Sequence, residues 1–202
     1  MKVEEIIHLS LLDQCDHDCP LCCNKQYDIN KVPTLMRQDM RNAKVFCLTG
    51  GEPFLLPIIN DIAYNLRNHL LISNPEELKI YAYTSGTALL HYLKEGGSLK
   101  EFNGISFSPK NKEDIKSIEE ILNTEKYFLQ VDKLQSNRLY VFPEMKELAM
   151  SKVLNSLRNK ENFTFIDREW QKKFKPNGGI FRLSPIRYKL IPAPAKAGST
   201  LA

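Results

Sequence analysis

Three cysteines within eight residues constrain this chain more than any other feature of its sequence. Cys15, Cys19 and Cys22 follow the first apolar run and are separated by three and then two residues. A short loop that folds back on itself can bring thiols with this spacing to one soft metal centre. A zinc knuckle would need a second Cys or His pair downstream, but the only cysteine beyond residue 23 is Cys47. Three ligands without a fourth indicate a centre with an open position.

A second motif, Thr49-Gly50-Gly51-Glu52-Pro53, comes directly after the second apolar run. Adjacent glycines let the backbone expose its N–H and C=O groups, and Glu52 offers an acceptor for an ammonium group. Taken alone, this pattern would be a plain Gly-Gly turn with a glutamate on the surface. Its position after the cysteine loop favours a shared site.

The two motifs together resemble the radical S-adenosylmethionine (radical SAM) superfamily. The resemblance implies that Cys15, Cys19 and Cys22 hold a [4Fe-4S] cluster whose free iron binds the amino and carboxylate groups of S-adenosylmethionine (SAM). It also implies a set of SAM-contacting residues: Gly50, Gly51 and Glu52 at the methionine end with Pro53 beside them, Leu21 near the adenine, Thr84 and Ser85 after the third strand, and Ser106, Ser108 and Lys110 around the end of the fourth. The family usually carries an aromatic residue at the position of Leu21, which covers a purine with less area and no stacking.

Apolar and amphipathic segments alternate along the chain in the pattern of βα units, which predicts an α/β fold with a parallel sheet. Strands are expected at 4–12, 43–48, 78–83, 102–107, 139–144 and 163–166, and helices at 33–41 with Thr34 as its cap, 57–71, 88–95, 111–123 and through 148–157. Both motifs fall at the C-terminal ends of strands, where parallel α/β folds place their chemistry. The resemblance implies a partial (β/α)6 radical SAM barrel over residues 1–175. Residues 176–202 are expected to be irregular, with a flexible or cloning-derived tail at 191–202.

Composition limits the classes of protein to which the chain can belong. No apolar run reaches the roughly 18 residues of a membrane span, and residues 1–5 lack a signal-peptide pattern, so a cytoplasmic protein without a membrane partner is expected. Five cysteines, three of them in one loop, fit a reducing compartment. The net charge of +4 arises largely after residue 170, where several basic residues have no acid nearby in the sequence: Lys172, Lys173, Lys175, Arg182, Arg187, Lys189 and Lys196. We interpret them as a solvated end, and nucleic acid is not an expected partner.

Several residues near the motifs have simpler explanations than a role in a site. His8 is expected to pack in the core, Cys47 to be core, and Cys23 to be a small buried thiol. Asp16, His17 and Asp18 are expected to be solvated, although His17 could reach a cluster sulfur or a substrate.

The resemblance implies an enzyme that cleaves SAM reductively and takes a hydrogen atom from a small-molecule or protein substrate. It also implies an electron donor such as flavodoxin or ferredoxin, and a homodimer is among the compatible assemblies. Ser-Pro-Lys at 108–110 and Pro-Glu at 143–144 weakly resemble 7-carboxy-7-deazaguanine synthases, but Cys23 stands where those enzymes carry a threonine associated with magnesium. A glycyl-radical-enzyme activase shares the small size and the cysteine spacing. The alternative from another class is a non-catalytic protein that holds zinc through the loop cysteines or His17, and it leaves the Gly-Gly-Glu-Pro motif unexplained.

Overall fold

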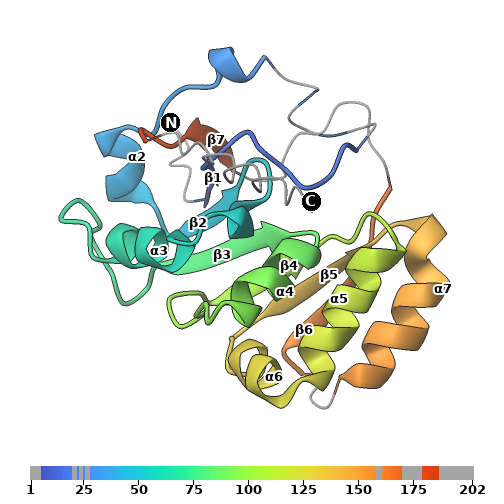
Figure 1. The fold of residues 1–202 in the computed structure, drawn as a ribbon. Coiled ribbons are helices and arrows are strands. Elements are labelled where there is room, and N and C mark those ends of the chain that lie inside the picture. Colours follow the sequence, from blue (N-terminus) through green and yellow to red (C-terminus); the bar gives the residue numbers. More distant parts are fainter. Residues whose placement is uncertain are drawn as a thin grey trace, which may run out of the picture.

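The computed structural model describes residues 6–19, 22, 25, 28–157, 161–169 and 179–186. Seven parallel strands form one sheet in the order β6-β5-β4-β3-β2-β1-β7 (Figure 1). The strands are β1 (Ile6–Ser10), β2 (Val45–Thr49), β3 (Lys79–Thr84), β4 (Gly104–Phe107), β5 (Asn137–Val141), β6 (Phe163–Asp167) and β7 (Ile180–Leu183). The predicted α/β class and the parallel sheet are therefore confirmed.

The connections between strands are mostly helical. They are α2 (Arg37–Asn42), α3 (Ile59–Arg67), α4 (Thr87–Lys94), α5 (Lys112–Asn123), α6 (Glu125–Asp132) and α7 (Lys146–Ala149), with 3-10 turns η1 (Ile29–Lys31), η2 (Pro53–Leu55) and η3 (Pro143–Met145) and a π-helical turn η4 (Met150–Leu154). Strands β1 to β6 are neighbours in chain order, so right-handed crossovers carry successive helices over the same face of the sheet. Figure 1 shows α3, α4, α5 and α7 along that face.

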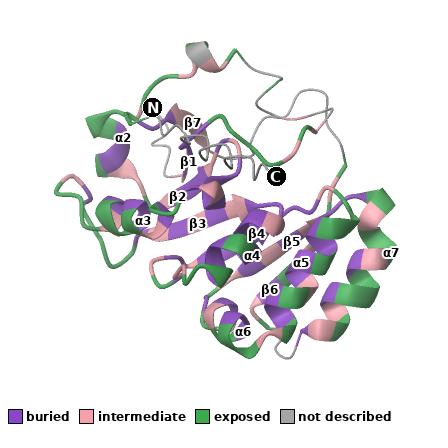
Figure 2. Ribbon diagram, in the orientation of Figure 1, coloured by how far each residue is buried: buried purple, intermediate pink, exposed green. Residues whose placement is uncertain are grey.

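The core lies between this face and the helices. Along β3, Ile80 and Ala82 are fully buried toward the helices, while Tyr81 and Tyr83 alternate with them and are only half-buried. Figure 2 shows that buried residues alternate with exposed ones along helices such as α5 and α7. The helices supply the other half of the core through residues three and four apart, as in α3, where Ile59, Ile62, Ala63 and Leu66 are buried. The opposite face of the sheet therefore carries the alternate residues of each strand, such as Tyr81 and Tyr83 of β3.

Local sequence signals determine where several of these helices begin and end. The side chain of Asn111 caps α5 by accepting the backbone N–H groups of Glu113 and Asp114, at 2.8 and 3.0 Å. Helix α4 starts after Gly86 and is followed by Gly96, both at positive φ.

Among the described residues, every helix is too short or too polar to span a membrane.

The structure corrects three expectations. Helix α2 begins at Arg37 rather than after Thr34, because Thr34 forms a parallel bridge with Leu183. Helix α6 was not expected from the sequence. The prediction of irregular structure after residue 176 is wrong for Ile180–Leu183, which form β7 and pair with β1 at the edge of the sheet.

The basic residues after position 170 also need a correction. Arg182 on β7 has an acidic partner, since its guanidinium binds both carboxylate oxygens of Asp39 on α2, at 2.7 and 3.1 Å. The ion pair helps to hold the edge strand against α2. The expected domain boundary at 175 and the tail at 191–202 lie outside the described residues.

Candidate functional site

The cysteine loop packs directly on the two glycines of the second motif. Gly50 and Gly51 follow β2 with φ of +81° and +57°. A Cβ on Gly50 would lie 2.0 Å from the hydroxyl oxygen of Ser10, and a Cβ on Gly51 would lie 1.8 Å from the carbonyl oxygen of Gln14. The next residue, Glu52, donates its backbone N–H to that same carbonyl at 2.9 Å. Only glycine permits this approach, so the two motifs form one local structure.

The structure places the three loop cysteines near one another. Cys15 is exposed, Cys19 and Cys22 are half-buried, and the N–H of Cys22 donates to the carbonyl of Cys19 at 3.2 Å. Burial raises the pKa of the Cys19 thiol, and the neighbouring thiols of Cys22 and Cys15 raise it further, against the lowering effect of Lys110 and His17. The thiols of Cys15 and Cys22 therefore lie close enough to that of Cys19 to act on its charge, at the carboxyl end of β1.

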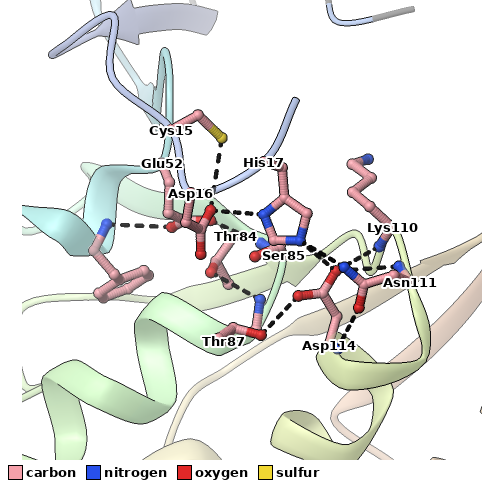
Figure 3. A network of polar contacts seen from close by, with 12 residues as sticks. Cys15, Asp16, His17, Glu52, Thr84, Ser85, Thr87, Lys110, Asn111 and Asp114 are labelled. Carbon is pink, nitrogen blue, oxygen red and sulfur yellow. Dashed lines mark hydrogen bonds and ion pairs between the residues drawn. The ribbon is translucent and has the colours of Figure 1, made fainter. Parts of the chain in front are cut away.

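Glu52 connects the loop after β2 to the loop after β3. Its side chain is only 2% exposed, and burial raises its pKa to about 7. One carboxylate oxygen accepts the N–H of Ser85 at 2.9 Å, and the other accepts the N–H of Phe54 at 3.2 Å (Figure 3). The second bond caps the 3-10 turn η2, which begins at Pro53. Both oxygens that were expected to receive an ammonium group thus already hold backbone donors.

The loop after β3 supplies hydroxyl groups next to Glu52. Thr84 accepts the N–H of Gly86 at 3.1 Å through its side chain, and its carbonyl accepts the N–H of Ser108 at 2.7 Å. Ser85 is 6% exposed, and its buried hydroxyl has no hydrogen-bond partner among the described residues. A buried hydroxyl without a partner costs free energy, so this atom is suited to a polar group of a ligand.

The end of β4 lies beside the cysteine loop. Ser106 and Ser108 are both buried, and the hydroxyl of Ser108 accepts the ammonium of Lys110 at 2.7 Å. That ammonium also lies 4.6 Å from the ring centre of Phe142, and its charge acts on the thiol of Cys19. Lys110 is therefore half-buried between neighbours, rather than a solvated surface lysine.

His17 contradicts the prediction of a solvated loop side chain. Its ring is 11% exposed and lies between two carboxylates, with Nδ1 2.7 Å from Asp16 and Nε2 2.9 Å from Asp114. Hydrogen bonds to Asp114 first and Asp16 second raise the pKa of His17 to about 12, so the ring is a cation near neutral pH. Asp16 and Asp18 are exposed, as predicted.

Asp114 anchors this contact from the first turn of α5. Its side chain is fully buried and accepts the hydroxyl of Thr87 and the backbone N–H of Lys110, both at 2.7 Å. Burial raises its pKa, but the hydrogen bonds from His17, Lys110 and Thr87 outweigh this effect and leave the pKa lowered. The cysteine loop is thus tied to two helix starts by one buried ion pair (Figure 3).

His8 and Cys47 are buried in β1 and β2, as predicted, but on the face of the sheet opposite the helices, and burial raises the pKa of the Cys47 thiol to about 11. Leu21 and Cys23 lie outside the described residues. The sequence reasoning missed the role of Asp114. The only local signal for it was the Asn111-to-Asp114 capping box, which indicates a helix start and says nothing of His17.

Comparison with protein-family models and with curated proteins finds no match to this chain.

Proposed function

We propose that this chain is a radical SAM enzyme, in which Cys15, Cys19 and Cys22 hold a [4Fe-4S] cluster and SAM binds beside it. The observation that carries the proposal is the packing of the cysteine loop on Gly50 and Gly51. Two motifs that are separate in the sequence share one edge of the sheet, so a ligand held by the loop would lie against the exposed backbone after β2.

The donor set fits an iron–sulfur cluster better than a single ion. One tetrahedral zinc ion with bonds of about 2.3 Å would hold its sulfurs about 3.8 Å apart. Cys15, Asp16 and His17 form a group of donor atoms within 4.8 Å, but Cys15, Cys19 and Cys22 do not form such a group. A cubane cluster takes each thiolate on a different iron and so needs a wider spacing. When bound, the cluster would supply the electron for reductive cleavage of SAM.

The chain's own residues fit the cofactor in two further respects. The orphan hydroxyl of Ser85 and the N–H and C=O groups of the Gly-Gly turn offer polar contacts beside the cysteine loop. The positive charge of Lys110, close to the thiol of Cys19, could meet a carboxylate. The order of β1 to β6 along the sheet supports the finer assignment of a partial (β/α)6 barrel, to which β7 adds an edge strand.

Anaerobic reconstitution with iron and sulfide tests the proposal. We expect a brown protein that bleaches on reduction and forms deoxyadenosine from SAM. Cys15→Ala, Cys19→Ala and Cys22→Ala should each lose the cluster and the cleavage of SAM, whereas Cys47→Ala, which removes a thiol from β2, should retain both. If the three loop variants keep the iron content and the deoxyadenosine yield of the unmodified chain, the proposal fails.

A mononuclear metal site is the second candidate, because the donor atoms of Cys15, Asp16 and His17 lie within 4.8 Å of one another. Both ring nitrogens of His17 already bind carboxylates, which makes His17 a poor metal ligand in this arrangement. Metal analysis separates the two candidates. A colourless protein that carries zinc and gains no iron would favour the mononuclear site.

A further inference from the structure

The face of the sheet that the described helices leave uncovered carries an unusual set of side chains. The strand register aligns His8 of β1 with Cys47 of β2 and Cys47 with Tyr81 of β3. Two residues further along β3, Tyr83 is aligned with Ser106, and Ser106 with Arg138 of β5. Because side chains alternate along a strand, these residues all lie on the face opposite the helices, where His8, Cys47 and Ser106 are buried and Tyr81, Tyr83 and Arg138 are half-buried.

Aromatic rings on this face form a continuous row. The ring of Tyr83 lies 6.1 Å from that of Tyr140 in a stacked arrangement and 6.2 Å from that of His8, and His8 stacks on Phe181 of β7 at 5.3 Å. Tyr81, Tyr83, Tyr140 and Phe181 are only half-buried by the described residues. Half-buried aromatic surface in a row of this length is suited to stacking with a flat ring.

Cations are interleaved with the rings. The guanidinium of Arg138 lies 5.6 Å from the ring centre of Tyr81, and that of Arg168 lies 5.3 Å from Tyr140. Burial lowers the pKa of Arg138, but the hydroxyl groups of Tyr140, Tyr83 and Tyr81 outweigh this effect and raise it. Within the described ranges, no carboxylate pairs with Arg138. A half-buried guanidinium held only by aromatic rings and hydroxyls retains its capacity to bind an anion in a bidentate manner.

The row leads to the cysteine loop. The guanidinium of Arg168 lies 5.8 Å from the ring centre of Phe142, and the ammonium of Lys110 lies 4.6 Å from the same ring centre. Lys110 in turn acts on the thiol of Cys19. The uncovered face and the candidate metal loop are therefore parts of one contiguous surface.

We propose that this face binds a small planar acid, an aromatic or heteroaromatic carboxylate, whose ring stacks on Tyr83 and Tyr140 and whose carboxylate binds Arg138. The inference rests on the proposed function, because it assigns the substrate class of the same site. A neutral substrate would leave the guanidinium without a counterion, and an aliphatic acid would leave the row of rings without a stacking partner.

Binding of two isosteric probes to the full chain tests the assignment. The probes are 2-naphthoate and 2-naphthamide, titrated into the anaerobically reconstituted protein by calorimetry. We expect 2-naphthoate to bind between about tenfold and hundredfold more tightly than 2-naphthamide, because only the acid forms a charge-assisted bond. Arg138→Gln should abolish that preference, and Arg138→Lys should restore part of it. Arg41→Gln, which removes an equal charge from the exposed surface of α2, should leave both affinities unchanged.

Tyr140→Leu separates stacking from charge, since it should weaken both probes by a similar factor while keeping the preference for the acid. Equal affinities for the two probes, no binding of 2-naphthoate, or unchanged binding to Arg138→Gln would each overturn the assignment. Iron content and deoxyadenosine formation report separately on the proposed function. A chain that binds the acid through Arg138 but takes up no cluster would refute the proposed enzyme class and leave the binding face intact.

Discussion

The buried ion pair between His17 and Asp114 gives the sharpest test of how the cysteine loop is held. Asp114 is fully buried and accepts four donors, at 2.9 Å from His17, 2.7 Å from Thr87, and 2.7 and 3.3 Å from the backbone N–H groups of Lys110 and Asn111. His17→Gln removes the one cation in this set. Breaking a buried ion pair costs about 3–5 kcal/mol. Since three neutral donors remain, we expect a loss of about 2–3 kcal/mol in the free energy of unfolding.

Urea denaturation of a double-mutant cycle measures this interaction. His17→Gln, Asp114→Asn and the double variant should give a coupling energy of about 2 kcal/mol. The proteolytic sensitivity of the cysteine loop should rise in both single variants, because each frees the loop from the start of α5. A coupling energy below about 0.5 kcal/mol would show that the pair does not hold the loop, and the reasoning would be wrong.

The stabilisation lost in His17→Gln should depend on pH, because folding raises the pKa of His17. The pKa of His17 rises from 6.5 in the unfolded chain to about 12 in the folded chain. Because this pKa is raised, the ion pair stabilises the folded chain fully below pH 6.5, and this stabilisation is lost progressively as the pH rises toward the pKa of His17 in the folded chain. The difference in unfolding free energy between the unmodified chain and His17→Gln should therefore be larger near about pH 6 than near about pH 9.

Three further predictions concern other contacts. Gly51→Ala should destabilise the chain by clearly more than Gly96→Ala, because both glycines have a positive φ but only the new Cβ at Gly96 would meet open space. Gly51→Ala should also lower iron uptake on reconstitution, and equal losses of stability in the two variants would mean that the loop does not press on Gly51. Glu52 has a pKa raised from 4.5 to about 7, so its charge destabilises the folded chain by about 3 kcal/mol as the pH rises through that window. Glu52→Gln should remove this slope in urea denaturation between about pH 4.5 and 7, and an unchanged slope would refute the assignment. Arg182→Met should cost about 2 kcal/mol by leaving Asp39 without its bidentate partner, and should speed amide exchange in β7; exchange rates like those of the unmodified chain would show that the pair does not hold the strand.

Local patterns were enough to predict most of the elements. The alternation of apolar strands with amphipathic helices indicated the parallel sheet, and β1 to β6 lie at the expected places within a few residues. The cysteine spacing and the adjacent glycines marked the two loops that meet at the edge of the sheet. These predictions succeeded because hydrophobic period, caps and turn glycines act over a few residues.

The contacts that define the site came only from the tertiary structure. His17 was expected to be solvated because its neighbours Asp16 and Asp18 are polar. Nothing near it in the sequence indicates that its ring will form an ion pair with the buried carboxylate of Asp114. Strand β7 was missed because four residues beside a basic, proline-rich stretch carry too little pattern, and its pairing with β1 supplies the hydrogen bonds that define it. Arg182 and Asp39 are 143 residues apart in the sequence.

The sequence by itself determined the secondary structure, the parallel sheet and the two loops that carry the candidate chemistry, because each depends on neighbouring residues. The tertiary structure alone decided which face of the sheet the helices leave uncovered, and so brought Tyr83, Tyr140 and Arg138 together. Strand register and crossover direction are properties of the whole chain, and they bring residues from different strands onto one surface.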